Sequence, residues 1–232
     1  SVSLREVVLN LTMFPDFLNV REVDGSYWTL QIELFFYIQM LFWFWAGALS
    51  RIRYVIVLWL AMAAAYAVAL QAGYQLSYTV REVLDLRYIP YFSVGMLLYR
   101  LHRDRRTSVP DGLMVLSAIG ITGLTWGGMD AVVLLGIVAV FLLMISGKLA
   151  FLSWRPLLFL GGISYTTYLL HQQIGFIIIY RLEHAGFSPL SSIVIASGAV
   201  LVLAWLLTRV VEQPALAKIR RLRMAHSGRA GG

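Results

Sequence analysis

The sequence LSSIVIASGAVLVLAWLLT at residues 190–208 contains no charged residue and is apolar along nearly its whole length. A helix rises about 1.5 Å per residue, so about 20 apolar residues cross the roughly 30 Å hydrocarbon core of a bilayer. A second stretch, YVIVLWLAMAAAYAVALQAG at residues 54–73, meets the same condition. Two such stretches in one chain indicate an integral membrane protein with the lipid bilayer as its partner.

The composition of the whole chain agrees with these two stretches. Of 232 residues, 59% are hydrophobic and 13% are charged, and the mean hydropathy is +0.75. An ordinary soluble domain has about 25% charged residues, so this composition excludes a disordered protein and a soluble nucleic-acid binder. The chain has no cysteine, which excludes disulfides and thiolate metal sites. We expect no metal site and no nucleic-acid partner.

Five further apolar blocks extend the pattern to seven candidate membrane spans. The blocks do not alternate between polar and apolar residues and are too long for barrel strands. In lipid, their backbone N–H and C=O groups must therefore form hydrogen bonds within helices. We predict an all-α, polytopic bundle of about seven transmembrane helices, forming a single membrane domain over residues 1–232. The spans are Trp28–Leu49, Tyr54–Gly73, Tyr88–Leu101, Gly112–Trp126, Asp130–Ser146, Ile163–Leu182 and Leu190–Arg209.

The basic residues predict how these spans are oriented. Fourteen of the 19 Lys and Arg lie in one set of alternate loops and in the C-terminal tail, and five lie in the other set. Lys and Arg are retained on the cytoplasmic side of a membrane. The C-terminus, with its basic tail 217–232, is therefore expected in the cytoplasm and residue 1 outside. In a bacterium this membrane would be the inner one.

Glu33 is a carboxylate inside the first span. A charge near the centre of a span costs at least about 2.5–3.5 kcal/mol, normally faces the bundle interior and marks a functional site by default. Thr29, Glu33 and Tyr37 are four residues apart and share one helix face, while Trp28 suits the outer interface. We predict a catalytic Glu33, with Trp28 and Tyr37 near the substrate. The alternative is an interface glutamate, or an ion pair with an arginine of another helix.

His171 lies near the middle of the sixth span. Histidine can act as a general base near neutral pH, so we predict a catalytic role with substrate contacts from Ser164, Tyr165 and Tyr168. The alternative is a neutral histidine bonded to a neighbouring helix, with nearby hydroxyls bonded to their own backbone. In a continuous helix, three- and four-residue spacing puts one set of residues on the same face. That set is Ser164, Thr167, Tyr168, His171 and Gly175.

Four segments occur in an order and spacing that one protein family also shows. GSYWTLQIELFFY at 25–37 is similar to the pattern W-S/T-L-x-x-E-x-x-F-Y, and ISYTTYLLH at 163–171 is the second specific segment. YFSVGMLLY at 91–99 and VEQP at 211–214 are weaker, and VEQP also suits a plain helix stop. Together they resemble the acyltransferase-3 family of integral membrane acyltransferases over residues 8–216 or so.

The resemblance implies a membrane-bound O-acyltransferase of the cell envelope. Such an enzyme moves an acyl group, expected to be acetyl, from acyl-CoA to a hydroxyl of a sugar, glycan or lipid-linked acceptor. The family begins with further spans, the first of which carries an Arg and a His held to be essential. Those spans have no counterpart in these residues, so we expect the chain to be the C-terminal two-thirds of such an enzyme.

Two other functions stay open at this point. A transporter or channel also uses intramembrane Glu and His, for proton relay, although the sequence has no internal repeat and no pair of Gly- or Pro-broken helices of the kind transporters show. A non-catalytic membrane subunit is the third class, because the first helices of the family are not among these residues.

The cytoplasmic arginines and the depth of the polar residues predict where the two substrates enter. Arginines of the cytoplasmic loop 100–106, above all Arg103, Arg105 and Arg106, are expected to contact the phosphates of acyl-CoA together with Arg51 and Arg53. The alternative is that these arginines only set topology. From the helical rise, Glu33 lies about 7–8 Å and His171 roughly 13 Å below the outer interface. We therefore expect the acceptor to enter from outside and the thioester to reach up from the cytosol.

Overall fold

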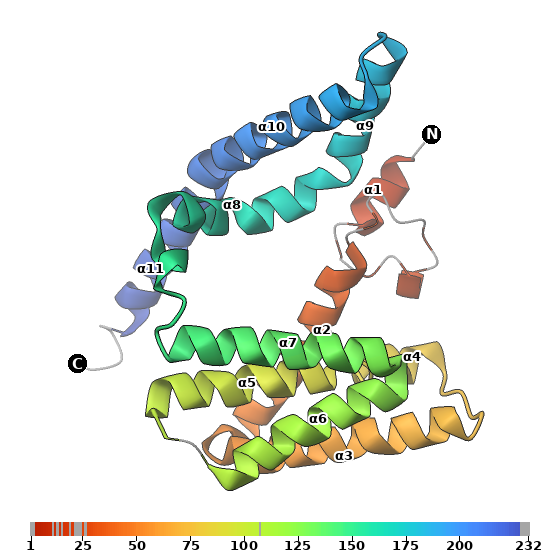
Figure 1. The fold of residues 1–232 in the computed structure, drawn as a ribbon, viewed down its shortest axis with the longest axis vertical. Coiled ribbons are helices and arrows are strands. Elements are labelled where there is room, and N and C mark those ends of the chain that lie inside the picture. Colours follow the sequence, from red (N-terminus) through yellow and green to blue (C-terminus); the bar gives the residue numbers. More distant parts are fainter. Residues whose placement is uncertain are drawn as a thin grey trace. The chain divides into compact units, whose positions relative to one another are not determined.

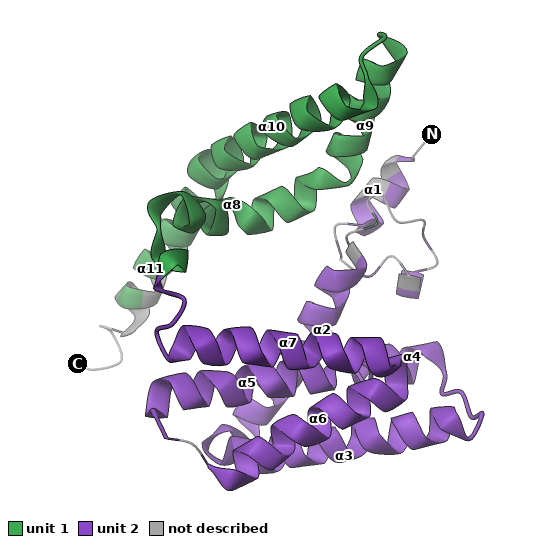
Figure 2. Ribbon diagram, in the orientation of Figure 1, with its two compact units in different colours: residues 1–2, 22–27, 151–232 green, residues 3–21, 28–150 purple. Residues whose placement is uncertain are grey.

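The computed structural model describes residues 3–10, 12, 14, 16–18, 20, 25, 27–106 and 108–227, and these residues form helices and connecting turns without a strand. The prediction of an all-α fold is confirmed. The chain divides into two compact units, which are described separately below (Figure 2). Unit 1 contains Ser1–Val2, Glu22–Tyr27 and Phe151–Gly232, and unit 2 contains Ser3–Arg21 and Trp28–Ala150.

Unit 2 is built around four long helices that lie side by side, α3, α5, α6 and α7 (Figure 1). A further long helix, α2, packs against them through Phe36, whose ring stacks on Phe92 of α5 at a centroid distance of 4.0 Å. The helices of this unit are α1 (Leu4–Asn10), η1 (Asp16–Leu18), α2 (Tyr27–Trp45), η2 (Ala48–Arg51), α3 (Ile52–Gln71), α4 (Tyr78–Val83), α5 (Ile89–Asp104), α6 (Val109–Trp126) and α7 (Gly128–Ile145).

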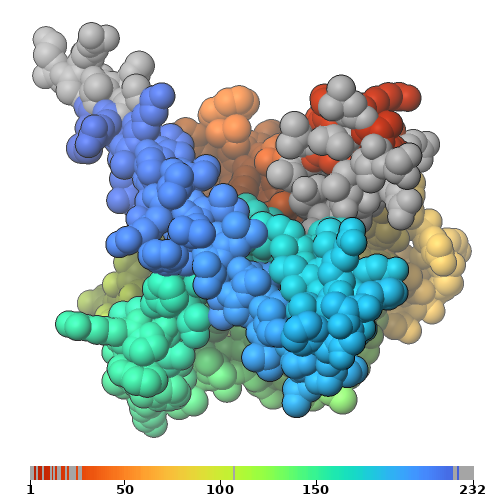
Figure 3. Space-filling model, turned by 90° about the horizontal axis from the view of Figure 1, so that it is seen from above, coloured from red at the N-terminus to blue at the C-terminus, as the bar shows by residue number. Residues whose placement is uncertain are grey.

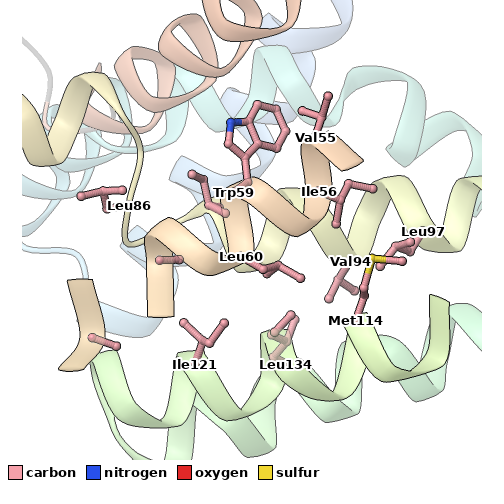
Figure 4. Packing of buried hydrophobic residues seen from close by; sticks show 14 of the residues in the cluster. Val55, Ile56, Trp59, Leu60, Leu86, Val94, Leu97, Met114, Ile121 and Leu134 are labelled. Atoms are coloured by element: carbon pink, nitrogen blue, oxygen red, sulfur yellow. The ribbon is translucent and has the colours of Figure 1, made fainter. Parts of the chain in front are cut away.

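The core of unit 2 follows from the spacing of large apolar residues on α3. Ile56, Trp59, Leu60 and Ala63 recur every three or four residues and are buried against α5, α6 and α7 (Figure 4). Such a stripe is the expected inner face of a packed helix. The opposite faces of α6 and α7 expose large apolar side chains, among them Leu116 and Val132, as lipid-facing surfaces do.

Unit 1 is a smaller set of helices in which α10 packs along both α8 and α9. Ser188 caps α10 by accepting a hydrogen bond from the backbone N–H of Ser191, and Pro189 occupies the first turn, as favoured at helix N-termini. Figure 3 looks onto α10, drawn in blue, whose large apolar side chains such as Leu190 and Val194 are exposed. The helices are η3 (Ala150–Ser153), α8 (Arg155–His171), α9 (Gln173–His184), α10 (Pro189–Leu207), the π-helical turn η4 (Thr208–Glu212) and α11 (Gln213–Ser227).

Among the described residues, four helical stretches are long and apolar enough to cross a membrane: Ala48–Gln71, Val109–Trp126, Gly128–Ile145 and Pro189–Arg221. They overlap four of the seven predicted spans, so a polytopic membrane protein is supported and the number seven stays a prediction. The sixth span, predicted as one helix over Ile163–Leu182, is corrected by the structure. It is broken at Gln172, where α8 ends and α9 begins.

Candidate active site

His171 is the last residue of α8, and its exposed side chain is held by its own helix. Its Nδ1 lies 2.5 Å from the carbonyl oxygen of Tyr168. Since a carbonyl can only accept, Nδ1 carries the proton and donates it, which leaves the Nε2 lone pair as the basic site of a neutral ring. The Tyr168 ring lies 5.4 Å from the imidazole, centroid to centroid. This arrangement presents Nε2 as a proton acceptor at the end of a helix.

The polar face predicted around His171 is only partly present. Thr167 donates to the carbonyl of Ile163 at 2.9 Å and Ser164 to that of Gly161 at 2.8 Å, the backbone pairing weighed as the alternative. Gly175 is buried on α9, beyond the break, and no longer belongs to the same helix face. Tyr165 and Tyr168 are exposed. The substrate contacts predicted for Ser164, Tyr165 and Tyr168 stay predictions.

Gly25 lies close to Gln172, the residue at the break beside His171. The backbone of Gly25 approaches Gln172 so closely that a Cβ at position 25 would lie 2.5 Å from Nε2 of the glutamine. Glycine is the residue that permits such an approach. Gly25 begins the segment 25–37, and Gln172 directly follows the segment 163–171. Within unit 1, the first residue of one segment that carried the resemblance therefore lies beside the residue that follows the other.

Glu33 lies on the side of α2 that unit 2 leaves exposed, as does Tyr37, while Thr29 is partly buried. The buried side of α2 is formed instead by Leu30, Gln31, Ile32 and Phe35. The expectation that Glu33 faces the interior is thus not met within unit 2. Because Glu33 belongs to unit 2 and His171 to unit 1, their proximity and the catalytic role of Glu33 stay predictions.

Asp85, in the turn between α4 and α5, is a buried carboxylate that the sequence analysis missed. Its side chain is 1% exposed, and its φ of 50° is left-handed, which is uncommon for a residue other than glycine. Gln39 of α2 donates to Asp85 Oδ2 at 3.2 Å and to the carbonyl of Val83 at 3.1 Å, whereas Oδ1 has no hydrogen-bond partner among the described residues. Burial, reinforced by the nearby Glu82, raises the pKa of Asp85 to about 8.

Glu212, the acidic residue of VEQP, joins two helices of unit 1. Thr166 of α8 and Thr208 both donate to its Oε2, at 3.0 and 3.2 Å, and the two hydroxyl oxygens are 3.0 Å apart. Thr208–Glu212 forms a π-helical turn, a rare geometry found frequently at functional sites. The segment is therefore more than the plain helix stop weighed as its alternative, because its carboxylate fixes α8 against the end of α10.

The arginines predicted to bind phosphate do not form one cluster. Arg103 pairs with Asp104 at 2.7 Å and lines a hollow of about 620 Å³ together with Arg100, Ser50 and Tyr99. The other two, Arg105 and Arg106, have different surroundings. Arg105 donates to the carbonyl of Ile145 at 3.0 Å, and Arg106 lines a separate apolar groove between α5, α6 and α7. Of the three predicted arginines, only Arg103 lines the hollow of about 620 Å³.

Arg100 and Arg53, which belong to the wider group of predicted phosphate contacts, also help to form this end of unit 2. The Nε of Arg100 is buried without a hydrogen-bond partner in the described part of the chain. Arg53 forms a bidentate pair with Asp111, at 2.8 and 2.9 Å, which ties α3 to α6. The loops whose charge fixed the predicted orientation thus lie at one end of the unit.

Comparison with known proteins decides the family. A family model described as an acyltransferase domain matches residues 3–209, most of the chain. The chain belongs to the acyltransferase-3 family. No curated protein and no solved structure matches it.

Membership of the acyltransferase-3 family, together with the apolar helices, makes this a membrane acyltransferase. The matched residues draw on both units, from α1 into the π-helical turn after α10. His171, Glu33 and Asp85 all lie inside the match, whereas Glu212 lies just beyond it.

Proposed function

We propose that this acyltransferase-3 protein moves an acetyl group from acetyl-CoA to a hydroxyl of a sugar, glycan or lipid-linked acceptor. The observation that carries the proposal is His171 at the end of α8, where the Tyr168 carbonyl fixes the proton on Nδ1 and Nε2 is left as the base. Acyl transfer to an alcohol needs such a base, because a neutral hydroxyl is a weak nucleophile.

The reaction follows from the chemistry of a thioester and an alcohol. Nε2 of His171 takes the proton of the acceptor hydroxyl as its oxygen bonds to the thioester carbonyl carbon. The tetrahedral intermediate carries its negative charge on the former carbonyl oxygen, where a phenol such as that of Tyr165 or Tyr168 can donate a hydrogen bond. The C–S bond then breaks, and the imidazolium returns the proton to the leaving sulfur.

In this proposal, the arginine-rich end of unit 2 receives the phosphates of the donor. Two arginines, Arg100 and Arg103, line one hollow of about 620 Å³, and guanidinium groups match phosphate oxygens in geometry and charge. Arg105 and Arg106 would add to the positive potential of the same end. The alternative, that these arginines serve only topology, makes a different prediction for binding.

Replacing Arg103, Arg105 and Arg106 together with glutamine is expected to raise the KM for acetyl-CoA at least threefold with unchanged insertion, because charge-assisted contacts to phosphate are lost. Initial rates against acetyl-CoA concentration measure this. Arg220→Gln with Arg221→Gln, on exposed positions of α11, is the control and should leave KM unchanged. An unchanged KM in the triple variant would assign the loop arginines to topology alone.

Glu33→Gln is expected to lower acyl transfer about tenfold while the protein still inserts and folds. The carboxylate is proposed to contribute its negative charge to the reaction, and the amide keeps the shape without the charge. Turnover by purified variants, with Trp45→Phe at another exposed position of α2 as control, tests this. Full activity of Glu33→Gln would return Glu33 to a structural role.

The function itself is tested by comparing cells that carry the intact gene with cells that lack it. Mass spectrometry of surface glycans is expected to show added acetyl groups, each about 42 Da, only when the gene is present. Flux of ions without any acylated product would instead support the transporter class.

A further inference from the structure

Three aromatic rings from three different helices meet at the end of unit 2 opposite its arginine-rich end. Trp28 lies in the first turn of α2, Tyr88 at the N-cap of α5, and Trp126 at the last residue of α6. The Tyr88 ring lies 6.2 Å from the ring of Trp28 and 5.7 Å from that of Trp126, centroid to centroid. The rings therefore form a continuous row with Tyr88 in the middle.

Arg87 extends this row and is fixed in place by three contacts. Its guanidinium lies over the Trp126 ring, 4.9 Å from the centroid, and its Nε donates to the Tyr66 hydroxyl at 3.1 Å. Its carbonyl accepts a hydrogen bond from the Trp126 indole at 3.3 Å. The two terminal amino groups of the guanidinium carry four further N–H donors. A rigid cation with such donors beside aromatic rings is a preorganised site for a polar ligand.

The two tryptophans at the ends of the row are accessible. Trp28 is 47% exposed and Trp126 39% exposed, so part of each ring can contact a ligand. By the count of basic residues, this end of unit 2 is the one away from the cytoplasm. It is therefore the end that an acceptor entering from outside would meet.

We propose that Trp28, Tyr88, Trp126 and Arg87 form an aromatic ledge that binds the sugar rings of a carbohydrate. One face of a pyranose ring presents C–H groups of partial positive charge, which the negative face of an aromatic ring attracts. The hydroxyls around the ring can accept from the guanidinium N–H groups. The inference rests on the proposed function, since it names the acceptor as a carbohydrate, and binding can be measured without turnover.

The alternative for the same residues is an interfacial aromatic belt, in which Trp and Tyr rings sit at the level of the lipid headgroups. A belt needs exposed rings but no fixed arginine beside them. The two explanations differ in what a substitution changes. A belt residue contributes to insertion and stability, and a ledge residue contributes to carbohydrate affinity.

The test uses the membrane-embedded full chain in nanodiscs and oligosaccharides released from the surface polysaccharide of the cells in which the protein is native. Saturation-transfer NMR reports binding through the sugar C–H protons. We expect Trp126→Ala and Trp28→Ala each to raise the Kd at least fivefold. Arg87→Gln should raise it at least threefold. Trp45→Ala, at a tryptophan that is 77% exposed at the other end of α2, is the matched control and should leave the Kd unchanged.

Trp28→Ala leaves the Trp126–Arg87 contacts intact, so it keeps the test valid should Trp126→Ala misfold. An unchanged Kd in Trp28→Ala, or no binding by the wild type, would overturn the ledge and leave a membrane-interface anchor. If the wild type transfers acetyl but the ledge variants bind the oligosaccharide with an unchanged Kd, this inference is overturned and the proposed function stands. Carbohydrate binding without any acetyl transfer would contradict the proposed function and leave the ledge standing.

Discussion

Replacing His171 with alanine is expected to lower the rate of acyl transfer at least about 100-fold, because general-base catalysis contributes about 10²–10⁴-fold. The loss should appear in kcat rather than in the KM for acetyl-CoA, since the imidazole acts on the acceptor proton. His171 is exposed at the end of α8 and bonds only to the carbonyl of Tyr168 among the described residues. The variant should therefore fold as the wild type does.

The chain offers a matched control for this substitution. His184 ends α9 as His171 ends α8, and its Nδ1 lies 2.8 Å from the carbonyl of Tyr180, whose ring is 4.0 Å away. His184 thus makes the same Nδ1-to-carbonyl contact as His171, but it lies outside the segment 163–171 that carries the family resemblance. His184→Ala is expected to leave transfer unchanged. Equal losses in the two variants would mean that His171 contributes to folding, and full activity of His171→Ala would remove it from the site.

Asp85→Asn is expected to stabilise the protein by an amount that grows as the pH rises from about 4 to about 8. In the folded chain, burial holds the pKa of Asp85 at about 8, whereas an unfolded aspartate titrates near 3.9. Between these values the folded state binds the extra proton, so the wild type loses stability with rising pH, at up to about 1.4 kcal/mol per unit. Above pH 8 both states are ionised and the difference becomes constant.

Thermal unfolding of wild type and variant at pH 5, 7 and 9 measures this difference. Asparagine tolerates the left-handed backbone of position 85, so the amide isolates the effect of the charge. Glu82→Gln is the companion variant. Glu82 raises the pKa of Asp85, and its neutralisation should reduce the pH dependence of the wild type. A stability difference that does not change with pH would contradict a buried, neutral Asp85.

The sequence predicted best the helices that come from long, charge-free apolar stretches, because such a stretch is by itself enough to predict a membrane helix. Residues 54–73 became α3 and residues 190–208 became α10 with the start of the π-helical turn. Charge-free stretches of this length have few other ways to satisfy their backbone in lipid. The break at Gln172 was missed because the chain has no proline or glycine there. Its accompanying contact comes from Gly25, almost 150 residues earlier.

Helical spacing also leaves open which face of a helix points inward. It placed Thr29, Glu33 and Tyr37 on one side of α2, and the packing of unit 2 buried Gln31 and Phe35 instead. Asp85 was missed for a related reason. It stands in a loop between two predicted spans, where an aspartate is ordinarily solvated, and only the packing of α4 and α5 around Gln39 buries it. Tertiary contacts, rather than local pattern, decide these positions.

The most direct test of the central claim is a transfer assay with the intact gene product, reconstituted in liposomes with [14C]acetyl-CoA and the surface oligosaccharides as acceptor. The account predicts radiolabel in the oligosaccharide, as an alkali-labile O-acetyl ester, and release of one free CoA thiol for each acetyl group transferred. The His171→Ala protein should transfer at most about one-hundredth as much. Release of CoA without label in the acceptor, or no turnover by a correctly folded protein, would contradict the account.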